Sequence, residues 1–421
     1  MRLLRRLPLV SVSCLAVIAV WIRPGVSAAP FLPQSRIASP AQPGVAARRP
    51  DTAPDGSCAA CHGATLKRAV VHAPASEDCT TCHTRQGTAH RFTMAAEGAD
   101  LCTSCHAVQT PNDRFVHGPV ATGDCVSCHD PHGGARRGLL RTDGSALCLT
   151  CHVEMQASIA QHRYAHGPVQ TDCAGCHDPH ASPNKYQLKA TGSALCFTCH
   201  TDLQQKVGQA PVKHDALTTE RQCLGCHEPH VADIRPQLRA TTMTLCLACH
   251  DREITAGDRT LVNIKAWLAN NPDAHGPIRQ QDCVACHRPH ASEHFRLLTH
   301  DYPSRFYSGF DPANYELCFT CHEPDLVRVE RTTTLTGFRD GDRNLHFLHV
   351  NRAEKGRTCR ACHEVHSSTK PKHIREKVPF GAWALPIKYE NQEGGGKCSP
   401  GCHVAVEYRR AANTVHVQPK P

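Results

Sequence analysis

The sequence has few of the side chains that usually build a hydrophobic core. Its 421 residues include only 11 Phe, 7 Tyr and 3 Trp, which excludes an ordinary aromatic-rich interior for a chain of this length. With 20 % charged and 40 % hydrophobic residues, it resembles neither a charged disordered polymer nor a membrane bundle. It has instead 27 cysteines and 31 histidines. We therefore expect something other than side chains to fill much of the interior.

Long apolar runs are also missing, apart from one at the N-terminus. Three arginines at positions 2, 5 and 6 precede an apolar run over 7–22, and Val26-Ser27-Ala28 follows it. This pattern predicts a signal peptide over residues 1–28, cleaved near Ala28. An uncleaved anchor is the alternative, but the run is shorter than the roughly 20 residues that a membrane-spanning helix needs. We expect an exported protein without a transmembrane segment in the mature chain.

No cysteine lies outside a paired motif once Cys14 is assigned to the signal peptide. The other 26 cysteines form pairs, and each pair is followed at once by histidine. Twelve pairs are C-x-x-C-H: Cys58, Cys61 and His62; Cys79, Cys82 and His83; Cys102, Cys105 and His106; Cys125, Cys128 and His129; Cys148, Cys151 and His152; Cys173, Cys176 and His177; Cys196, Cys199 and His200; Cys223, Cys226 and His227; Cys246, Cys249 and His250; Cys283, Cys286 and His287; Cys318, Cys321 and His322; Cys359, Cys362 and His363. The thirteenth motif, Cys398, Cys402 and His403, has one extra residue.

The motif matches the chemistry of c-type haem attachment. Its two thiols lie about one helical turn apart, so both can add to the vinyl groups of one porphyrin edge, and the adjacent histidine can bind the iron. Zinc ribbons, disulfides and thioredoxin-like sites do not require histidine at that one position. We predict thirteen covalently attached haem c groups, including one at the Cys398 motif, where Pro400 and Gly401 permit an irregular backbone.

The motifs recur as an internal repeat. Their first cysteines are 21 to 27 residues apart from Cys58 to Cys246 and 35 to 41 residues apart beyond it. Some motifs are preceded by leucine, as at Leu147, Leu195, Leu245 and Leu317, and others carry a further histidine three residues after the motif histidine.

The remaining histidines are candidate second iron ligands. Five follow a motif directly: His132, His180, His230, His290 and His366. Seven precede a motif by 7 to 12 residues: His72, His90, His117, His166, His214, His275 and His349. The thirteenth ligand remains open between His162, His294, His300, His346, His373 and His416. Only four methionines are present, so two histidines on each iron is the expected ligation.

These residues resemble the doubled C-x-x-C-H family of multihaem c-type cytochromes. The match is most specific at Cys173-Ala-Gly-Cys176-His177-Asp-Pro-His180, followed by Leu195-Cys196-Phe-Thr-Cys199-His200. The resemblance implies exported electron carriers with haems stacked in chains, in the periplasm, in outer-membrane conduits or at the cell surface. The long spacers beyond Cys249 and the Cys398 motif depart from the plain repeat.

We predict a mostly irregular fold with short α-helices, an elongated multihaem array in which stacked haems replace the hydrophobic core. Residues 29–57, with six prolines, form an expected Pro/Ala-rich linker. Residues 58–291 form a repeated region with ten haems, and residues 292–421 a C-terminal region with three. We also predict a helix over residues 253–270 and a hinge at Gly394-Gly395-Gly396. The seven aromatics of 292–319 either cover haem edges or form a docking face.

The formal charge of +9 does not indicate nucleic-acid binding. Four arginines leave with the signal peptide, and each ferric haem with ionised propionates adds about one negative charge. The basic side chains are then expected to pair with propionates.

We predict a periplasmic, outer-membrane-associated or extracellular electron carrier without a catalytic residue. The expected partners are other redox proteins, namely cytochromes and quinol-oxidising or terminal reductase modules, with an outer-membrane β-barrel as a further candidate. The alternatives are a reductase of a small substrate with one open-site haem, with the Cys398 motif as its best candidate, and a structural filament subunit.

Overall fold

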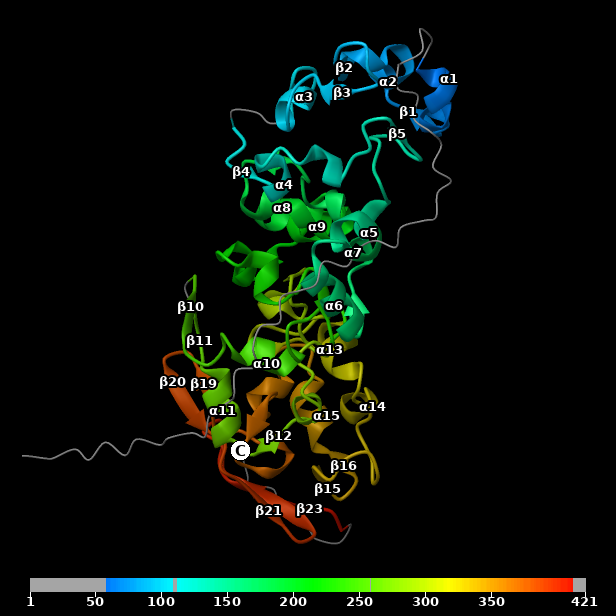
Figure 1. The fold of residues 1–421 in the computed structure, drawn as a ribbon. Coiled ribbons are helices and arrows are strands. Elements are labelled where there is room, and N and C mark those ends of the chain that lie inside the picture. Colours follow the sequence, from blue (N-terminus) through cyan, green and yellow to red (C-terminus); the bar gives the residue numbers. More distant parts are fainter. Residues whose placement is uncertain (1–57, 109–111, 258, 412–421) are drawn as a thin grey trace, which may run out of the picture.

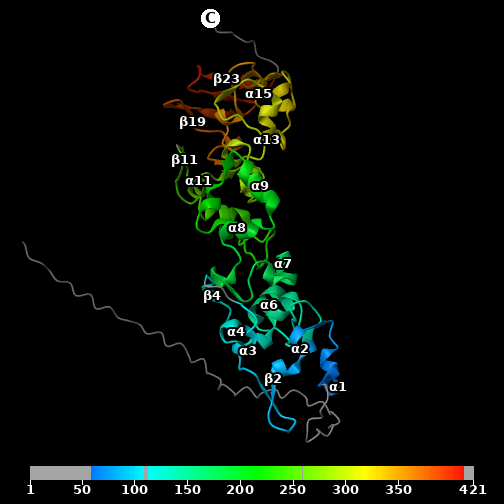
Figure 2. The same cartoon turned by 90° about the horizontal axis from the view of Figure 1, so that it is seen from above.

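The computed structural model describes residues 58–108, 112–257 and 259–411. The predicted signal peptide and linker lie outside these residues. The described chain forms an elongated column, with the first motifs at one end and the last strands at the other (Figures 1 and 2). It is mostly irregular with short helices, as predicted, and it also contains small sheets, which were not predicted. None of its described helices is long and apolar enough to cross a membrane.

Motifs preceded by leucine begin inside short helices. In each, the second cysteine and the histidine follow the helix end, and the histidine N–H donates to the carbonyl of the first cysteine, as His152 does to Cys148 at 3.0 Å. The helices are α3 Ala99–Thr103, α5 Gly144–Leu149, α8 Gly192–Phe197, α10 Thr242–Leu247 and α13 Glu316–Phe319. The first motif begins at α1 Ala59–His62, continued by η1 Gly63–Leu66.

The alternate motifs occupy single 3₁₀ turns or irregular backbone. The turns are η2 Cys79–Thr81, η3 Cys125–Ser127, η4 Cys173–Gly175, η7 Gln222–Gly225 and η10 Cys359–Ala361. Most of the upstream histidines stand directly before a short helix, and proline in its first turn favours helix initiation there. These helices are α2 Ala73–Glu77, α4 Gly118–Ala121, α7 Gly167–Thr171 and α12 Gly276–Arg279, with η6 Asp215–Thr218 in the corresponding place after His214.

Five antiparallel strand pairs connect residues 62 to 95 positions apart. Each pairs the residues before an upstream histidine with the residues after a later Cys-His-x-x-His segment, as in Phe115↔Ser182 and Val116↔Ala181. The pairs are β1 Val70–Val71 with β5 Gly133–Gly134, β4 Phe115–Val116 with β7 Ala181–Ser182, β6 Tyr164–Ala165 with β9 Val231–Ala232, β8 Val212–Lys213 with β13 Ala291–Ser292, and β12 Asp273–Ala274 with β18 Ser367–Ser368. These ladders connect each part of the column to the next.

The remaining helices and hairpins lie between these elements. The helices are α6 Val153–Gln161, α9 Thr201–Gln209, α11 Ile264–Asn270, α14 Asp325–Arg328 and α15 Leu345–Val350, and the further 3₁₀ turns are η5 Lys185–Gln187, η8 Phe295–Leu297, η9 Pro312–Tyr315 and η11 Pro371–His373. The hairpins are β2 His83–Arg85 with β3 Phe92–Met94, β10 Ile254–Ala256 with β11 Arg259–Leu261, β15 Arg339–Asp340 with β16 Arg343–Asn344, and β19 Lys377–Phe380 with β20 Trp383–Pro386. β14 Tyr307–Ser308 pairs with β17 Gly356–Arg357, and β21 Tyr389–Gln392, β22 Gly395–Cys398 and β23 Val406–Arg409 form a three-stranded sheet.

Two local predictions were wrong. The helix expected over 253–270 is a hairpin followed by the shorter α11, because Gly257 turns the chain at φ 62° and Asn263 caps a new helix at Ala266 N. The expected glycine hinge lies partly in β22, where Gly395 and Gly396 are buried. A Cβ on Gly396 would lie 2.6 Å from the hydroxyl oxygen of Tyr408, so the glycines here permit close packing of β23.

One hydrophobic cluster forms around two motifs of the C-terminal region. Buried Tyr302, Tyr315 and Val350 pack with Cys318 and Cys359. Aromatics of the 292–319 stretch supply much of this cluster, which fits their interpretation as cover for haem edges. Tyr315 is fully buried.

Candidate functional site

Each of the thirteen motif histidines faces a second histidine that lies outside the motifs. The ring centroids are 5.9 to 6.5 Å apart in every pair. The pairs, with the motif histidine first, are His62 and His90, His83 and His132, His106 and His72, His129 and His180, His152 and His117, His177 and His230, His200 and His166, His227 and His290, His250 and His214, His287 and His366, His322 and His275, His363 and His346, and His403 and His349.

This spacing fits two axial ligands of one iron. A metal–imidazole bond is about 2 Å long and the ring centroid lies about 1 Å beyond the nitrogen, so imidazoles on opposite sides of one metal are roughly 6 Å apart between centroids. All twelve histidines that the sequence assigned as second ligands occupy such a position. His346 is the thirteenth, one of six candidates that the sequence left open.

The other described candidates do not face a motif histidine. His162 Nδ1 donates to Ser158 O at 2.9 Å, and His300 Nδ1 lies 3.1 Å from Thr299 Oγ1. His294 Nδ1 lies 3.0 Å from Asp301 Oδ1, and His373 packs edge-on against His275. His416 lies outside the described residues.

The pairing follows a rule that extends across the repeat. We define a doubled unit as an upstream histidine followed by two motifs. The upstream histidine faces the second motif histidine of its own unit, as His117 faces His152. The first motif histidine faces the histidine that follows the first motif of the next unit, as His129 faces His180. Each unit is therefore completed by a ligand from its successor.

The two ends of the array depart from this rule. His62 has no upstream histidine within the described residues and faces His90 from the β2–β3 hairpin. His363 has no later unit and faces His346 on α15. The motif at His83 carries no Pro-His segment, which fits the rule because no first motif of an earlier unit needs it.

Backbone contacts hold the second ligands of neighbouring sites together. His117 N donates to His180 O at 2.9 Å, and the same contact joins His72 to His132, His166 to His230, His214 to His290 and His275 to His366. In addition, His117 Nδ1 donates to Pro179 O at 2.9 Å. His72 and His214 make the equivalent bonds to Pro131 and Pro289. These bonds orient each ring and leave Nε2 for the metal.

Five of the six first-motif histidines in the described chain are oriented by a carbonyl nine residues later. His177 Nδ1 donates to Tyr186 O at 2.8 Å, and His363 Nδ1 donates to Lys372 O at 2.8 Å. The same bond occurs at His129, His227 and His287. Tyr186 and Lys372 have φ near +60°, an uncommon conformation for residues with a side chain, which turns the accepting carbonyl toward the ring.

Burial favours the neutral, metal-binding form of the imidazoles toward the C-terminal end. It lowers the pKa of His346 to about 3 and that of His366 to about 4. Burial also lowers the pKa of His287, His349 and His363. Protons therefore do not compete for these nitrogens near neutral pH.

Cysteines of consecutive motifs lie beside one another along the whole array. Thirteen motifs make twelve contacts between consecutive motifs, and at each contact burial and a thiol of the adjacent motif raise the pKa of a cysteine. Burial is the larger cause except at Cys246 and Cys318, where the hydrogen bond to the neighbouring thiol is the larger cause. The neighbours are Cys58 and Cys79, Cys82 and Cys102, Cys102 and Cys125, Cys128 and Cys148, Cys148 and Cys173, Cys176 and Cys199, Cys196 and Cys223, Cys226 and Cys249, Cys246 and Cys283, Cys286 and Cys321, Cys318 and Cys359, and Cys362 and Cys398. Motif order in the sequence is therefore motif order in space.

The last motif borders a mostly apolar cavity of about 320 Å³. Cys398, His403 and His349 line it together with Arg352 and Arg357, and apolar side chains from α15, β23 and their surroundings complete the wall. Such a cavity suits a flat apolar ring with two carboxylates. The irregular Cys398 motif, like the others, has a second histidine, His349, opposite its own.

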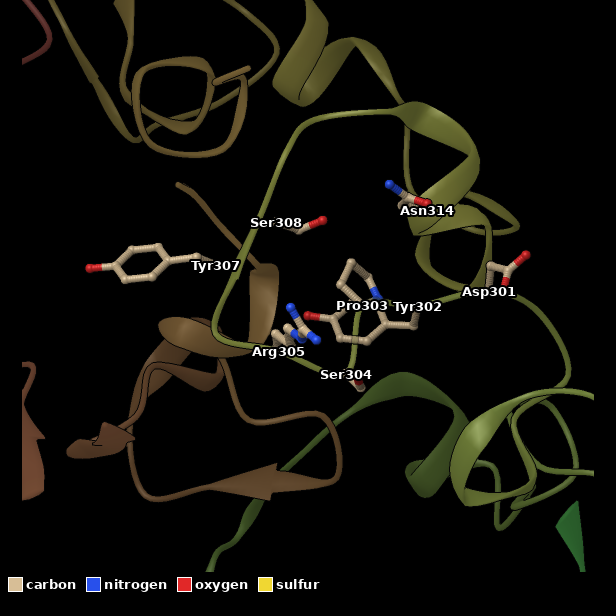
Figure 3. A pocket seen from close by; sticks show the side chains of 8 residues that line it. All are labelled: Asp301, Tyr302, Pro303, Ser304, Arg305, Tyr307, Ser308 and Asn314. Atoms are coloured by element: carbon tan, nitrogen blue, oxygen red, sulfur yellow. The ribbon is translucent and has the colours of Figure 1, made fainter. Parts of the chain in front are cut away.

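A second cavity, of about 220 Å³, has no motif residue in its lining. It is lined by the loop 301–308 and Asn314, with the Tyr302 ring in its wall (Figure 3). No cysteine or histidine lines it.

Comparison with known families matches the repeat. The doubled CXXCH motif family matches residues 72–110, 117–157, 166–205, 214–255 and 275–326, about half of the chain, and each matched segment begins at an upstream histidine. No curated protein matches the chain. Within the described residues, no three Cys, His, Asp or Glu side chains converge into a metal-binding group; the histidines meet in pairs. The chain belongs to the doubled CXXCH motif family and is a multihaem c-type cytochrome with covalently bound haem c.

Proposed function

We propose that the chain binds thirteen haem c groups, each between two histidines, and conducts electrons along them in single file. The observation that carries this proposal is the pairing of all thirteen motif histidines with a second imidazole at 5.9 to 6.5 Å. The bound haems supply one-electron chemistry at iron, and the chain supplies ligation, burial and charge.

The contacts between consecutive motifs support an unbranched path. Because thioether bonds fix one edge of each porphyrin at its cysteines, neighbouring cysteines bring neighbouring porphyrin edges together. The column has its first motif near one end and its last motif near the other (Figure 1). The path then runs from the Cys58 haem to the Cys398 haem, over the length of the described protein.

Complete ligation argues against the reductase alternative at the last motif. Substrate chemistry at iron requires an open coordination position, and His349 stands opposite His403 at 6.5 Å. Nδ1 of His349 donates to Leu345 O at 2.7 Å, which holds this ring in place. Electron transfer is therefore the function that this arrangement favours.

We further propose that the protein is exported and that its two ends meet different redox partners. The N-terminal sequence pattern and the attachment of haem c outside the cytoplasm support export. The proposed partners are a cytochrome or quinol-oxidising module as donor and a terminal reductase module or outer-membrane conduit as acceptor.

Intact mass and electron paramagnetic resonance (EPR) test the haem count and ligation together. We expect the purified holoprotein to carry thirteen haems and to show only low-spin bis-histidine ferric iron. Twelve or fewer haems, or several high-spin irons in the untreated protein, would contradict the proposed array.

Single-molecule conductance tests the path. Cysteines introduced at exposed Glu77 and Glu390 tether the holoprotein between two electrodes. Removing an interior haem with C173A/C176A should reduce the current strongly, because the electron must cross a gap twice as long. The matched control is Arg136→Gln, at an exposed arginine, which should leave the current unchanged. An unchanged current in C173A/C176A would rule out a single-file path.

A further inference from the structure

At each end of the array, one motif histidine has no second ligand of the regular pattern, and a different histidine takes that place. His346 serves the His363 site and His90 serves the His62 site. The comparison of these two replacements rests on the proposed haem ligation. His346 is the firmly held ligand of the two, and His90 is the weakly held one.

His346 is firmly held within the fold. It lies in the first turn of α15, where fully buried Asn344 caps the helix and accepts from His346 N at 2.9 Å. Its Nδ1 lies 3.1 Å from Thr336 Oγ1, and its ring packs edge-on against Phe338 at 5.1 Å. Moving this ring away from iron would disrupt buried packing.

His90 has fewer and weaker supports: its ring packs edge-on against Phe92 at 5.5 Å, but Phe92 is itself exposed. It lies in the loop of the β2–β3 hairpin, whose residues 84–88 and 91–95 are exposed on both strands. Phe92 is 39 % exposed and Met94 is 47 % exposed, so the hairpin buries little apolar surface. A two-stranded hairpin is marginally stable by itself, and local opening of such segments costs little free energy.

The ring of His90 also lacks an acceptor. Its Nδ1 is buried without a hydrogen-bond partner, whereas a carbonyl accepts from Nδ1 of His72, His117 and His214. Donation from the distant nitrogen raises the basicity of a metal-bound imidazole, so His90 is the weaker ligand. Its ring is inclined by 48° to that of His62, against 2° to 31° in the other twelve pairs.

We propose that His90 is a displaceable ligand and that the first iron of the array binds a small diatomic π-acceptor of the carbon monoxide type in its place. In this exchange on ferrous iron, the bond to His90 Nε2 breaks and a bond to the diatomic ligand forms, with no net transfer of electrons. The hairpin moves the ring away while Cys82 and His83 hold its base. The other twelve irons keep both histidines.

Carbon monoxide titration of the dithionite-reduced holoprotein tests this inference. We expect one carbon monoxide per thirteen haems, at a rate that becomes independent of carbon monoxide concentration because departure of His90 limits it. In His90→Ala, the stoichiometry should stay at one while the rate becomes proportional to carbon monoxide concentration. His346→Ala is the matched variant at the other end and should add a second binding site.

Each contrary outcome has a distinct meaning. No binding to the wild-type protein, or binding whose rate His90→Ala leaves unchanged, would refute the displaceable ligand. Persistence of the site in C58A/C61A, which lacks the first haem, would refute its location. A haem count below thirteen, or abundant high-spin iron in the same untreated sample, would instead refute the proposed array.

Discussion

Substitution of His180 by alanine tests the exchange of ligands between units. His180 belongs to the segment that carries Cys173, Cys176 and His177, yet its ring stands 6.0 Å from that of His129. His177 faces His230 instead, at 6.1 Å. The substitution should therefore open a coordination position on the iron of the Cys125 motif, which begins 48 positions before the Cys173 motif. The iron of the Cys173 motif itself should keep both histidines.

The expected size of the effect follows from the number of sites. One of thirteen irons loses its second ligand, so one thirteenth of the low-spin ferric EPR intensity should become high-spin. The backbone bond from His117 N to His180 O does not involve the side chain, so the adjacent ladder of β4 and β7 should persist. The neighbouring His117–His152 site should then remain low-spin.

Removal of individual haems identifies which iron changes. In C125A/C128A, which lacks the haem beside His129, His180→Ala should add no high-spin iron. In the matched control C173A/C176A, the same substitution should still add one. The reverse result would show that His180 serves its own motif and would refute the rule of ligation between units.

Three further substitutions probe the C-terminal region. Arg375→Gln should lower the free energy of unfolding by about 3–5 kcal/mol, because Arg375 and Glu364 form a buried pair at 3.0 Å with side chains only 10 % and 18 % exposed. The control is Arg239→Gln in the equivalent but more exposed pair of Arg239 and Glu228, for which about 1 kcal/mol or less is expected. Equal urea midpoints for the two variants would contradict this reasoning. Arg360→Gln should lower the midpoint potential of the haem between His287 and His366. Arg360 Nε is buried without a hydrogen-bond partner, and the positive charge of Arg360 near His366 favours the less positive ferrous state. An EPR redox titration measures this potential, and an unchanged or raised value would refute the prediction. Tyr315→Ala should destabilise the cluster around Cys318 and Cys359 by roughly 3–5 kcal/mol, whereas alanine at Tyr186, which is 64 % exposed, should cost far less in the same urea titration.

Much of the site could be predicted because covalent chemistry imposes it on the sequence. Haem attachment requires two cysteines and an adjacent histidine within one turn, so the thirteen motifs are local patterns. The twelve assigned second ligands also follow local patterns: a histidine three residues after a motif histidine, or a histidine shortly before a motif. Local patterns did not predict the fold of 253–270, where the turn at Gly257 and the cap at Asn263 override the apolar periodicity.

The sequence by itself determined the number of motifs, the motif ligands and the irregular character of a chain with few aromatic residues. Only the tertiary structure decided which histidine stands opposite which, because partners such as His129 and His180 are brought together by strand ladders between segments more than 60 residues apart. It also selected His346 among the open candidates and distinguished it from His90. The physical reason is that a ligand's position and firmness depend on the helix, the hydrogen bonds and the packing around its ring, none of which a local pattern of residues specifies.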